Sequence, residues 1–170
     1  RKESSAASDV YKRQTLSSVC IRKPNQLNQD RLIIARSFIN SLPHARYMGM
    51  RIDEIGTGFA VMSLPYNAIV NGDITEKSIH SIAISGLIDT CGGLSVLAHK
   101  LQPLETATMN LRVDYLRPAA LNQEVRARAE CYYISDSVAY VKATAEDNSS
   151  RDPIATALGT FAIIKERIIS

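Results

Sequence analysis

Apolar residues between Lys77 and Lys100 recur every three or four positions, which is the spacing of one helical face. The positions on this face are Ile79, Ile82/Ala83, Gly86/Leu87, Cys91, Leu94 and Leu97/Ala98. The other sides of this stretch are also mostly apolar, and a helix that is apolar nearly all round is usually a buried one. The pattern therefore predicts a central buried helix, with Ser78 as its N-cap.

Asp89 is the only carboxylate between the two lysines that bound this stretch. Burying an ionised carboxylate without partners is expensive, so we expect this side chain to face a pocket. Ser81, Ser85 and Asp89 are four residues apart and therefore stack on one face of the predicted helix.

Alternating apolar and polar residues predict strands on both sides of the helix. Two strands precede it, at 47–55 and 59–64, around a hairpin signal at 56–58. Four strands follow it as a meander, with turns at 136–137 and 147–150; they cover 106–118, 124–134, 137–146 and 154–165. A first helix is predicted at 29–42, ended by Pro43, and the loop 65–78 contains an Asn71-Gly72 turn.

Together these elements predict an α+β fold, in which one antiparallel sheet wraps around the long central helix. The length of 170 residues is that of a single domain. Because one sheet covers only about half of a helix, the rest of the helix surface implies an oligomer or a second layer.

The first residues of the chain have no such pattern. The segment 4–14 reads S-S-A-A-S-D-V-Y-K-R-Q and resembles the translation of a sequencing adaptor. We expect 1–14 to be a disordered artefact and 15–28 to be a loose segment outside the fold. The segment 1–14 carries +2 of the formal net charge of +3. The remaining chain is nearly neutral, and no basic stripe points to nucleic acid.

Cysteine and histidine are few and scattered. Three cysteines, far apart in the sequence, argue against a disulfide framework or a thiolate metal site and favour a reducing cytoplasm. Three separate histidines form no ligand cluster. The apolar run 79–98 is long enough to suggest a membrane span, but His80 and Asp89 argue against one. The predicted protein is cytoplasmic, without a metal, a membrane or a nucleic-acid partner.

Three motifs occur in a characteristic order. The first is I-H-S-I-A-I-S-G-L-I-D-T-C-G-G at 79–93, the second is L-R-V-D-Y-L-R-P-A at 111–119, and the third is P-I-A-T-A-L-G-T-F at 153–161. Together they resemble the hotdog-fold acyl-CoA thioesterases, specifically the phenylacetyl-CoA thioesterase-like (PaaI-like) family. The first motif is similar to the family's H-G-G-x-x-x-x-L-x-D-T-A, with His80 and Asp89 at the family's separation. The resemblance covers 29–165 and implies one hotdog domain.

The resemblance implies catalytic roles for three residues. Asp89 matches the family's catalytic carboxylate, which acts as general base or nucleophile on the thioester. Ser81 stands where the family has a glycine whose backbone N–H polarises the thioester carbonyl. Thr108 matches a hydroxyl that helps to place the acid or the water.

Four further residues are expected at the substrate. Asn71 matches an asparagine in the loop before the histidine, although its spacing to His80 is longer than usual. His80 itself is expected to be a hydrogen-bonded residue more than a base. Ile82 replaces the family's second glycine and is expected to narrow the acyl pocket, and Arg117 is a candidate contact for the phosphates of coenzyme A.

The chemistry supports a site shared by two chains. A thioester hydrolase needs donors aimed at the developing oxyanion and a base for water. A helix N-terminus, here at 79–82, supplies free N–H groups and a positive dipole end. Asp89 lies roughly 13 Å along the axis from His80 at ~1.5 Å per residue. Two antiparallel helices bring both to one carbonyl, and one chain does not, which favours a homodimer or tetramer.

The first hypothesis is therefore a thioesterase that hydrolyses acyl-CoA at a dimer interface, with no cofactor because coenzyme A is part of the substrate. A second hypothesis is a non-catalytic module that binds or senses acyl-CoA, in which the replacement of both glycines marks lost turnover. A third is a hotdog hydratase or dehydratase acting on acyl thioesters, which requires an acid–base histidine in the pocket.

Overall fold

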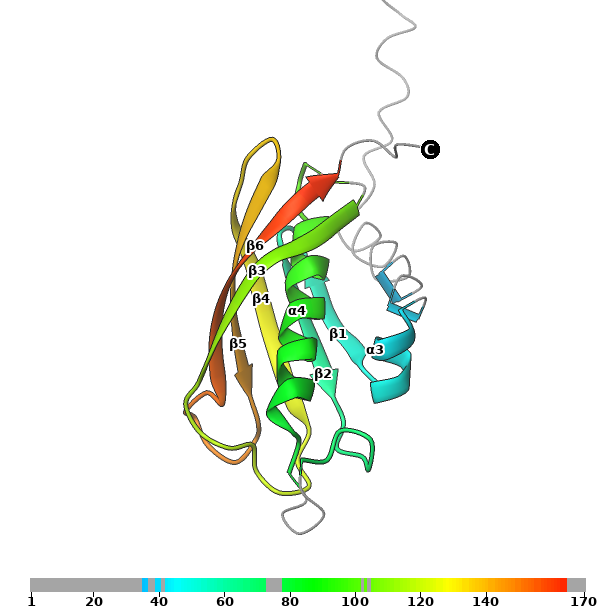
Figure 1. Cartoon of the computed structure of the whole chain (residues 1–170), viewed down its shortest axis with the longest axis vertical. Coiled ribbons are helices and arrows are strands. Elements are labelled where there is room, and N and C mark those ends of the chain that lie inside the picture. The colour runs from blue at the N-terminus through cyan, green and yellow to red at the C-terminus, as the bar shows by residue number, and fades with distance from the viewer. Residues whose placement is uncertain are drawn as a thin grey trace, which may run out of the picture.

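The structure is a computed structural model with one long helix and a six-stranded sheet (Figure 1). It describes residues 35–36, 39–40, 42–72, 78–101, 103 and 105–164. In chain order the elements are α3 (Pro43–Met48), β1 (Arg51–Gly56), β2 (Phe59–Leu64), α4 (Ser81–Leu97), β3 (Glu105–Tyr115), β4 (Val125–Ile134), β5 (Val138–Glu146) and β6 (Ala155–Ile164). The predicted segments 1–14 and 15–28, and most of the predicted helix 29–42, lie outside the described residues.

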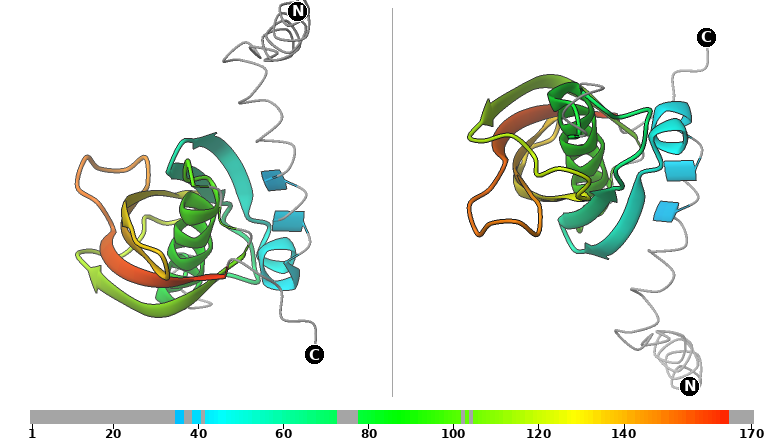
Figure 2. Two further views of the ribbon diagram at one scale, coloured as in Figure 1. Left: turned by 90° about the horizontal axis from the view of Figure 1, so that it is seen from above. Right: turned by 90° about the horizontal axis from the view of Figure 1, so that it is seen from below.

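The strands form one antiparallel sheet in the order β1-β2-β4-β5-β6-β3. Figure 2 shows the sheet curving around α4. Buried and exposed residues alternate along β5 and most of β4, so each strand turns one row of small apolar side chains toward the helix. The predicted α+β architecture, an antiparallel sheet around a long central helix, is confirmed.

The strand order corrects the predicted meander. β3 does not pair with β4; it pairs with β6 at one edge of the sheet, and β4 pairs instead with β2. The connection 116–124 therefore leads from the sheet edge to its middle. The pattern along a strand indicates which face is buried but not which strand lies beside it, so the sequence left this order open.

The start of the described chain also differs from the prediction. Pro43 is predicted to end a helix but lies in the first turn of α3. Amides in the first turn have no acceptor within the helix, so the lack of an N–H on proline costs no hydrogen bond there. Gly49, with φ of 76°, ends α3 in the left-handed conformation that glycine adopts readily. Tyr47 and Met48 are therefore helical, and the first strand begins at Arg51.

The helix α4 begins at Ser81, later than a cap at Ser78 would place it. Ile79 is held in a β-bridge to Asn71, and the Gly72 N–H donates to the Ser78 carbonyl at 2.9 Å. These contacts keep the residues before the helix extended. The predicted Asn71-Gly72 turn continues into 73–77, which lie outside the described residues.

His80 is the N-cap of α4. Its backbone is extended, with φ of −64° and ψ of 141°, and its Nδ1 accepts the Ile82 N–H at 3.1 Å. A side chain that accepts a hydrogen bond from this position satisfies one of the orphan donors of a helix start. This confirms the expectation that His80 is hydrogen-bonded.

One side of α4 is covered by the sheet and one stripe is open. Leu87 and Cys91 are fully buried, and burial raises the pKa of the Cys91 thiol to about 12, which leaves it an inert core residue. On the open side, Ile82 is 75% exposed and Asp89 is half-buried. The predicted helix, buried nearly all round, is thus only partly covered by its own chain.

A bulge in β3 sets which of its side chains face α4. Thr108 pairs with Phe161, and Tyr115 pairs with Ala155, six residues away on β6. Thr108 and Tyr115 are seven residues apart, so a regular strand would point them to opposite faces. The register shift between Thr108 and Asn110 adds Met109 as an extra residue. Both side chains therefore face the helix.

An ion pair fastens the connection that follows β3. The Arg117 guanidinium donates from Nη1 to Asp147 Oδ2 at 3.0 Å and from Nη2 to Oδ1 at 2.9 Å. Its remaining N–H groups donate to the carbonyls of Asp152 and Pro118, so all five are used. The Asp147 side chain is fully buried and also accepts the Ala120 N–H. The Arg117 pair holds the pKa of the Asp147 carboxyl well below its usual range.

Two adjacent glycines of α4 offer a matched test of packing. A Cβ on Gly92 would lie 2.8 Å from Cζ of the buried Phe161, whereas a Cβ on Gly93 would make ordinary contacts, with Thr106 Cγ2 at 3.7 Å and Phe161 Cε1 at 3.9 Å. Overpacking costs about 1–3 kcal/mol, and alanine gains roughly 1 kcal/mol over glycine in a helix. In urea unfolding we expect Gly92→Ala to destabilise the protein and Gly93→Ala to be neutral or stabilising. Equal effects would show that Phe161 does not pack there.

The Arg117–Asp147 pair predicts a pH dependence of stability. Because the folded pKa of Asp147 is lowered, its contribution is present above the unfolded pKa of about 4 and is lost as the pH falls below that value. Asp147→Asn should lower the free energy of unfolding at pH 7 by about 3 kcal/mol and flatten its acid dependence. As a control, Asp114→Asn removes an exposed pair with Arg112 and should change stability by less than about 1 kcal/mol. A similar loss in both variants would contradict this account.

Candidate active site

A cleft of about 600 Å³ lies at the N-terminal end of α4. His80, Ser81 and Ile84 line it from the helix start. The end of β3 and the residues after it form the facing wall, namely Tyr115, Leu116, Arg117, Pro118 and Ala119. Three residues that precede the helix also line the cleft: Gly72, Ser78 and Ile79. The volume is in the usual range for small-molecule sites. The cleft brings together three residues predicted for the site, namely His80, Ser81 and Arg117.

The Ser81 amide at the helix start has no acceptor among the described residues. The four amides around it already have acceptors: those of His80, Ile82, Ala83 and Ile84. The Val70 carbonyl accepts the first of these, and the side chain or carbonyl of His80 accepts the other three. No described residue accepts the Ser81 N–H, and Ser81 lines the cleft. A free N–H at the positive end of a helix favours an anionic or polarised oxygen.

The predicted acid lies elsewhere on the helix. Thr108 Oγ1 donates to Asp89 Oδ1 at 2.7 Å, so the expected partnership of these residues is present. Asp89 is eight residues beyond Ser81 on α4, about 12 Å along the axis. It does not line the cleft. Within one chain, the Asp89 carboxylate therefore lies too far from the Ser81 amide for both to contact the same carbonyl group.

Arg117 requires a correction. Each of its N–H groups already donates to Asp147 or to a backbone carbonyl, so none is left for a phosphate of coenzyme A. The guanidinium charge is also neutralised by a buried carboxylate. Arg117 lines the cleft as a structural residue, which fastens the segment after β3 to Asp147 and Asp152.

Asn71 and Ile82 lie next to the cleft without lining it. Asn71 Oδ1 is buried and has no hydrogen-bond partner among the described residues. Ile82 points to the open side of α4, being 75% exposed. Ile82 does not line the cleft of a single chain, so the expectation that it narrows an acyl pocket stays a prediction. Contact between Asn71 and the substrate also stays a prediction.

Tyr115 is a cleft residue that the sequence did not identify. Its hydroxyl donates to the Ser81 carbonyl at 2.7 Å and is hydrogen-bonded to Ser85 Oγ. The sequence placed it in the predicted strand 106–118 and gave it no role in the site. Its true orientation depends on the extra residue at Met109, and no pattern in the sequence marks that bulge.

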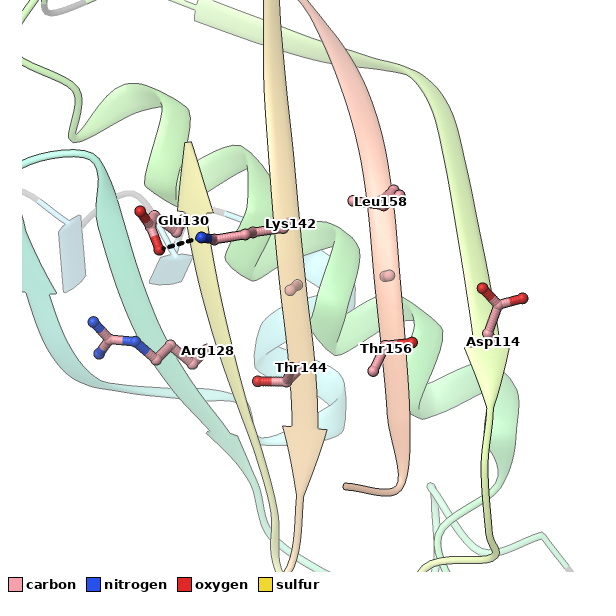
Figure 3. Close-up of a pocket in the computed structure, with 9 residues that line it drawn as sticks. Asp114, Arg128, Glu130, Lys142, Thr144, Thr156 and Leu158 are labelled. Atoms are coloured by element: carbon pink, nitrogen blue, oxygen red, sulfur yellow. Dashed lines mark ion pairs between the residues drawn. The ribbon is translucent and has the colours of Figure 1, made fainter. Parts of the chain in front are cut away.

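A second hollow, of about 300 Å³, lies on the outer face of the sheet (Figure 3). Its charges are largely paired: Lys142 lies 3.2 Å from Glu130, and the Arg128 guanidinium lies 4.5 Å from the centre of the Phe59 ring. It contains none of the residues predicted for the site. These exposed pairs are typical of a solvated sheet surface.

In the described part of the chain, no three His, Cys, Asp or Glu side chains are grouped as a metal ion would require. Among the described helices, none combines the length and apolar character needed to cross a membrane.

Curated relatives of this chain are distant. A candidate esterase of Halobacterium salinarum is 25% identical over 145 residues, which are 81% of this chain and 95% of that protein. The medium/long-chain acyl-CoA thioesterase YigI of Salmonella typhimurium is 24% identical over 104 residues, 54% of this chain and 67% of that one.

Solved structures share the whole fold. A Pseudomonas aeruginosa protein is 28% identical with a TM-score of 0.71, over 79% of this chain and 99% of that one. The Escherichia coli PaaI protein, from the phenylacetic acid degradation operon, has a TM-score of 0.70 at 19% identity, over 81% and 96% of the two chains. The family model of the thioesterase superfamily matches residues 78–154, the segment that contains α4 and the cleft wall. This segment is similar to the thioesterase superfamily, and the described fold is the hotdog fold that these solved structures share.

Proposed function

We propose that this protein hydrolyses acyl-CoA thioesters to a free acid and coenzyme A, at a site shared by two copies of the chain. The observation that carries the proposal is the Ser81 N–H, a donor without an acceptor among the described residues, at a helix N-terminus that lines a cleft of suitable size. The match of residues 78–154 to the thioesterase superfamily supports the reaction class, and the relative named as a medium/long-chain acyl-CoA thioesterase supports the substrate class.

The Ser81 N–H would bind the thioester carbonyl oxygen. As water adds to the carbonyl carbon, this oxygen gains negative charge, and a fixed donor at the positive end of α4 stabilises it more than the neutral carbonyl. In the PaaI-like family that the sequence resembles, a glycine stands at this position. Ser81 replaces that glycine and keeps the backbone N–H. Its side chain is exposed, so the amide does not depend on a glycine at this position.

Asp89 would act as the general base, from a second copy. Its carboxylate takes a proton from water as the oxygen of that water bonds to the carbonyl carbon. The tetrahedral intermediate then collapses, the C–S bond breaks, and the proton passes to the leaving thiolate. The hydrogen bond from Thr108 leaves the second carboxylate oxygen of Asp89 available for water.

The shape of one chain supports the pairing of two copies. The open stripe of α4 carries Ile82 and Asp89, and β3 beside it is an edge strand of the described sheet. A twofold axis beside α4 would set two helices antiparallel. Asp89 of one copy would then lie near Ser81 of the other. The same contact would cover Ile82, whose exposure in a single chain is otherwise unexplained.

The carboxylate is tested by Asp89→Asn, which is nearly isosteric and can still accept the Thr108 hydrogen bond. We expect thiol release from acyl-CoA to fall by about 10²–10⁴-fold, because the amide does not take up a proton. Size-exclusion chromatography should show an unchanged assembly. Retention of most of the wild-type turnover would make Asp89 a structural residue.

The free amide is tested by Ser81→Pro. Proline is favoured at the first helical position, and the extended backbone of His80 suits a residue before proline. The variant therefore removes one N–H with little disturbance, and kcat should fall by about 10²–10³-fold. Ser81→Ala keeps the N–H and should retain activity. If both variants behave alike, the amide does not bind the carbonyl.

The same two variants test whether the site is shared. Mixed dimers of Asp89→Asn and Ser81→Pro chains have one intact site, so random exchange should restore about a quarter of wild-type activity. No recovery, with exchange verified by differently tagged chains, would place both residues in one chain's site. If the wild-type protein binds acyl-CoA without releasing thiol, it is a binding module instead.

A further inference from the structure

A chain of hydrogen bonds holds the first peptide of α4 from both ends. The carbonyl of the peptide between Ser81 and Ile82 accepts the Tyr115 hydroxyl at 2.7 Å, and its N–H donates to His80 Nδ1 at 3.1 Å. Because the Tyr115 proton is used on that carbonyl, Ser85 Oγ is the donor in its contact with the Tyr115 oxygen. The hydrogen bonds therefore run in one direction: Ser85 donates to Tyr115, Tyr115 donates to the peptide carbonyl, and the peptide N–H donates to His80.

This arrangement fixes the plane of that peptide. A peptide is rigid, so holding its C=O and its N–H leaves it little freedom to rotate. The preceding peptide carries the free Ser81 N–H, and the two share the Ser81 Cα. Their relative orientation depends on the backbone dihedrals of Ser81. Fixing one plane therefore restricts the direction in which the free N–H points.

The contact with Tyr115 is not one that packing requires. Its side chain is 45% exposed and lines the cleft rather than the core. Within the helix the Ser81 carbonyl normally accepts the N–H of the residue four positions on. Tyr115 is thus an additional donor to a helix carbonyl, at the one turn where an amide is left free.

The strand β3 makes polar contacts with α4 at two places along the helix. Thr108 binds the carboxylate of Asp89, and Tyr115 binds the helix start. The extra residue at Met109 turns both side chains to the same face of the strand. One strand therefore holds the proposed acid and the proposed oxyanion donor, although they lie about 12 Å apart along the helix.

We propose that Tyr115 is a positioning residue for the oxyanion site, acting through the Ser81–Ile82 peptide. This proposal rests on the proposed thioesterase function. It gives Tyr115 a role in kcat more than in KM, because the direction of the Ser81 N–H matters most when the carbonyl oxygen carries charge. Partners that orient a reacting group typically contribute about 10-fold to 100-fold.

The test is Tyr115→Phe, which removes only the hydroxyl. We expect kcat for acyl-CoA hydrolysis to fall by about 10-fold to 100-fold and KM to change by less than about threefold. The matched control is Tyr140→Phe, a tyrosine of similar exposure on the outer face of the sheet, which packs against Tyr132 and Tyr133. It should leave both constants unchanged.

A second readout does not depend on activity. With the chain labelled at isoleucine amides, hydrogen exchange of the Ile82 N–H should become about tenfold faster or more in Tyr115→Phe, since that peptide is no longer held at its carbonyl. Ser85→Ala leaves the Tyr115 hydroxyl on the carbonyl and should have a smaller effect on both exchange and kcat. It also provides a milder variant if Tyr115→Phe reduces the folded fraction.

The outcomes separate this inference from the proposed function. Unchanged kcat and unchanged Ile82 exchange in Tyr115→Phe would overturn the positioning role, even if the wild type is an active thioesterase. A raised KM with unchanged kcat would also overturn it, because Tyr115 would then contact substrate directly. If the wild type releases no thiol, the proposed function is wrong. Ile82 exchange alone then decides whether Tyr115 holds the helix start.

Discussion

The covering of α4 is the constraint on which the rest of the structure depends. A helix with apolar residues on most of its surface must be removed from water, and one curved sheet does this on the side of Leu87 and Cys91. The sheet cannot close around the whole helix, so a stripe that includes Ile82 and Asp89 remains open. The proposed acid is therefore placed on the surface left uncovered by the same packing that stabilises the fold.

The helix start follows a second requirement, the satisfaction of backbone donors. The bridge at Ile79 ends the loop, and His80 takes up three of the amides that follow. One donor at Ser81 is left without a described acceptor and lies in a cleft. Around it the structure is well supported, by Tyr115 on one side and by the Arg117–Asp147 pair behind the facing wall. A free donor within a rigid frame is the arrangement that electrostatic stabilisation of an oxyanion requires.

The sequence predicted the elements well because their periodicity reflects burial against one helix. The strands after α4 alternate with period two, and each predicted boundary lies within a few residues of the observed one. What it did not predict depends on contacts between distant segments. The Asn71–Ile79 bridge delays the start of α4, and β3 pairs with β6 rather than β4. The pairing of Thr108 with Asp89 agrees with a family resemblance, whereas the role of Arg117 follows only from the buried Asp147 that uses its donors.

The separation of Asp89 from Ser81 links assembly to chemistry. A rigid helix holds them about 12 Å apart, and the core beneath it allows no bend that would bring them together. Under the proposed function, a single chain would present half of a hydrolytic site at each of these two positions. Antiparallel contact along that stripe would complete two sites at once and bury Ile82 with the same surface. Activity would then require the interface itself, and a loss of association would remove catalysis without any change in the fold of a chain.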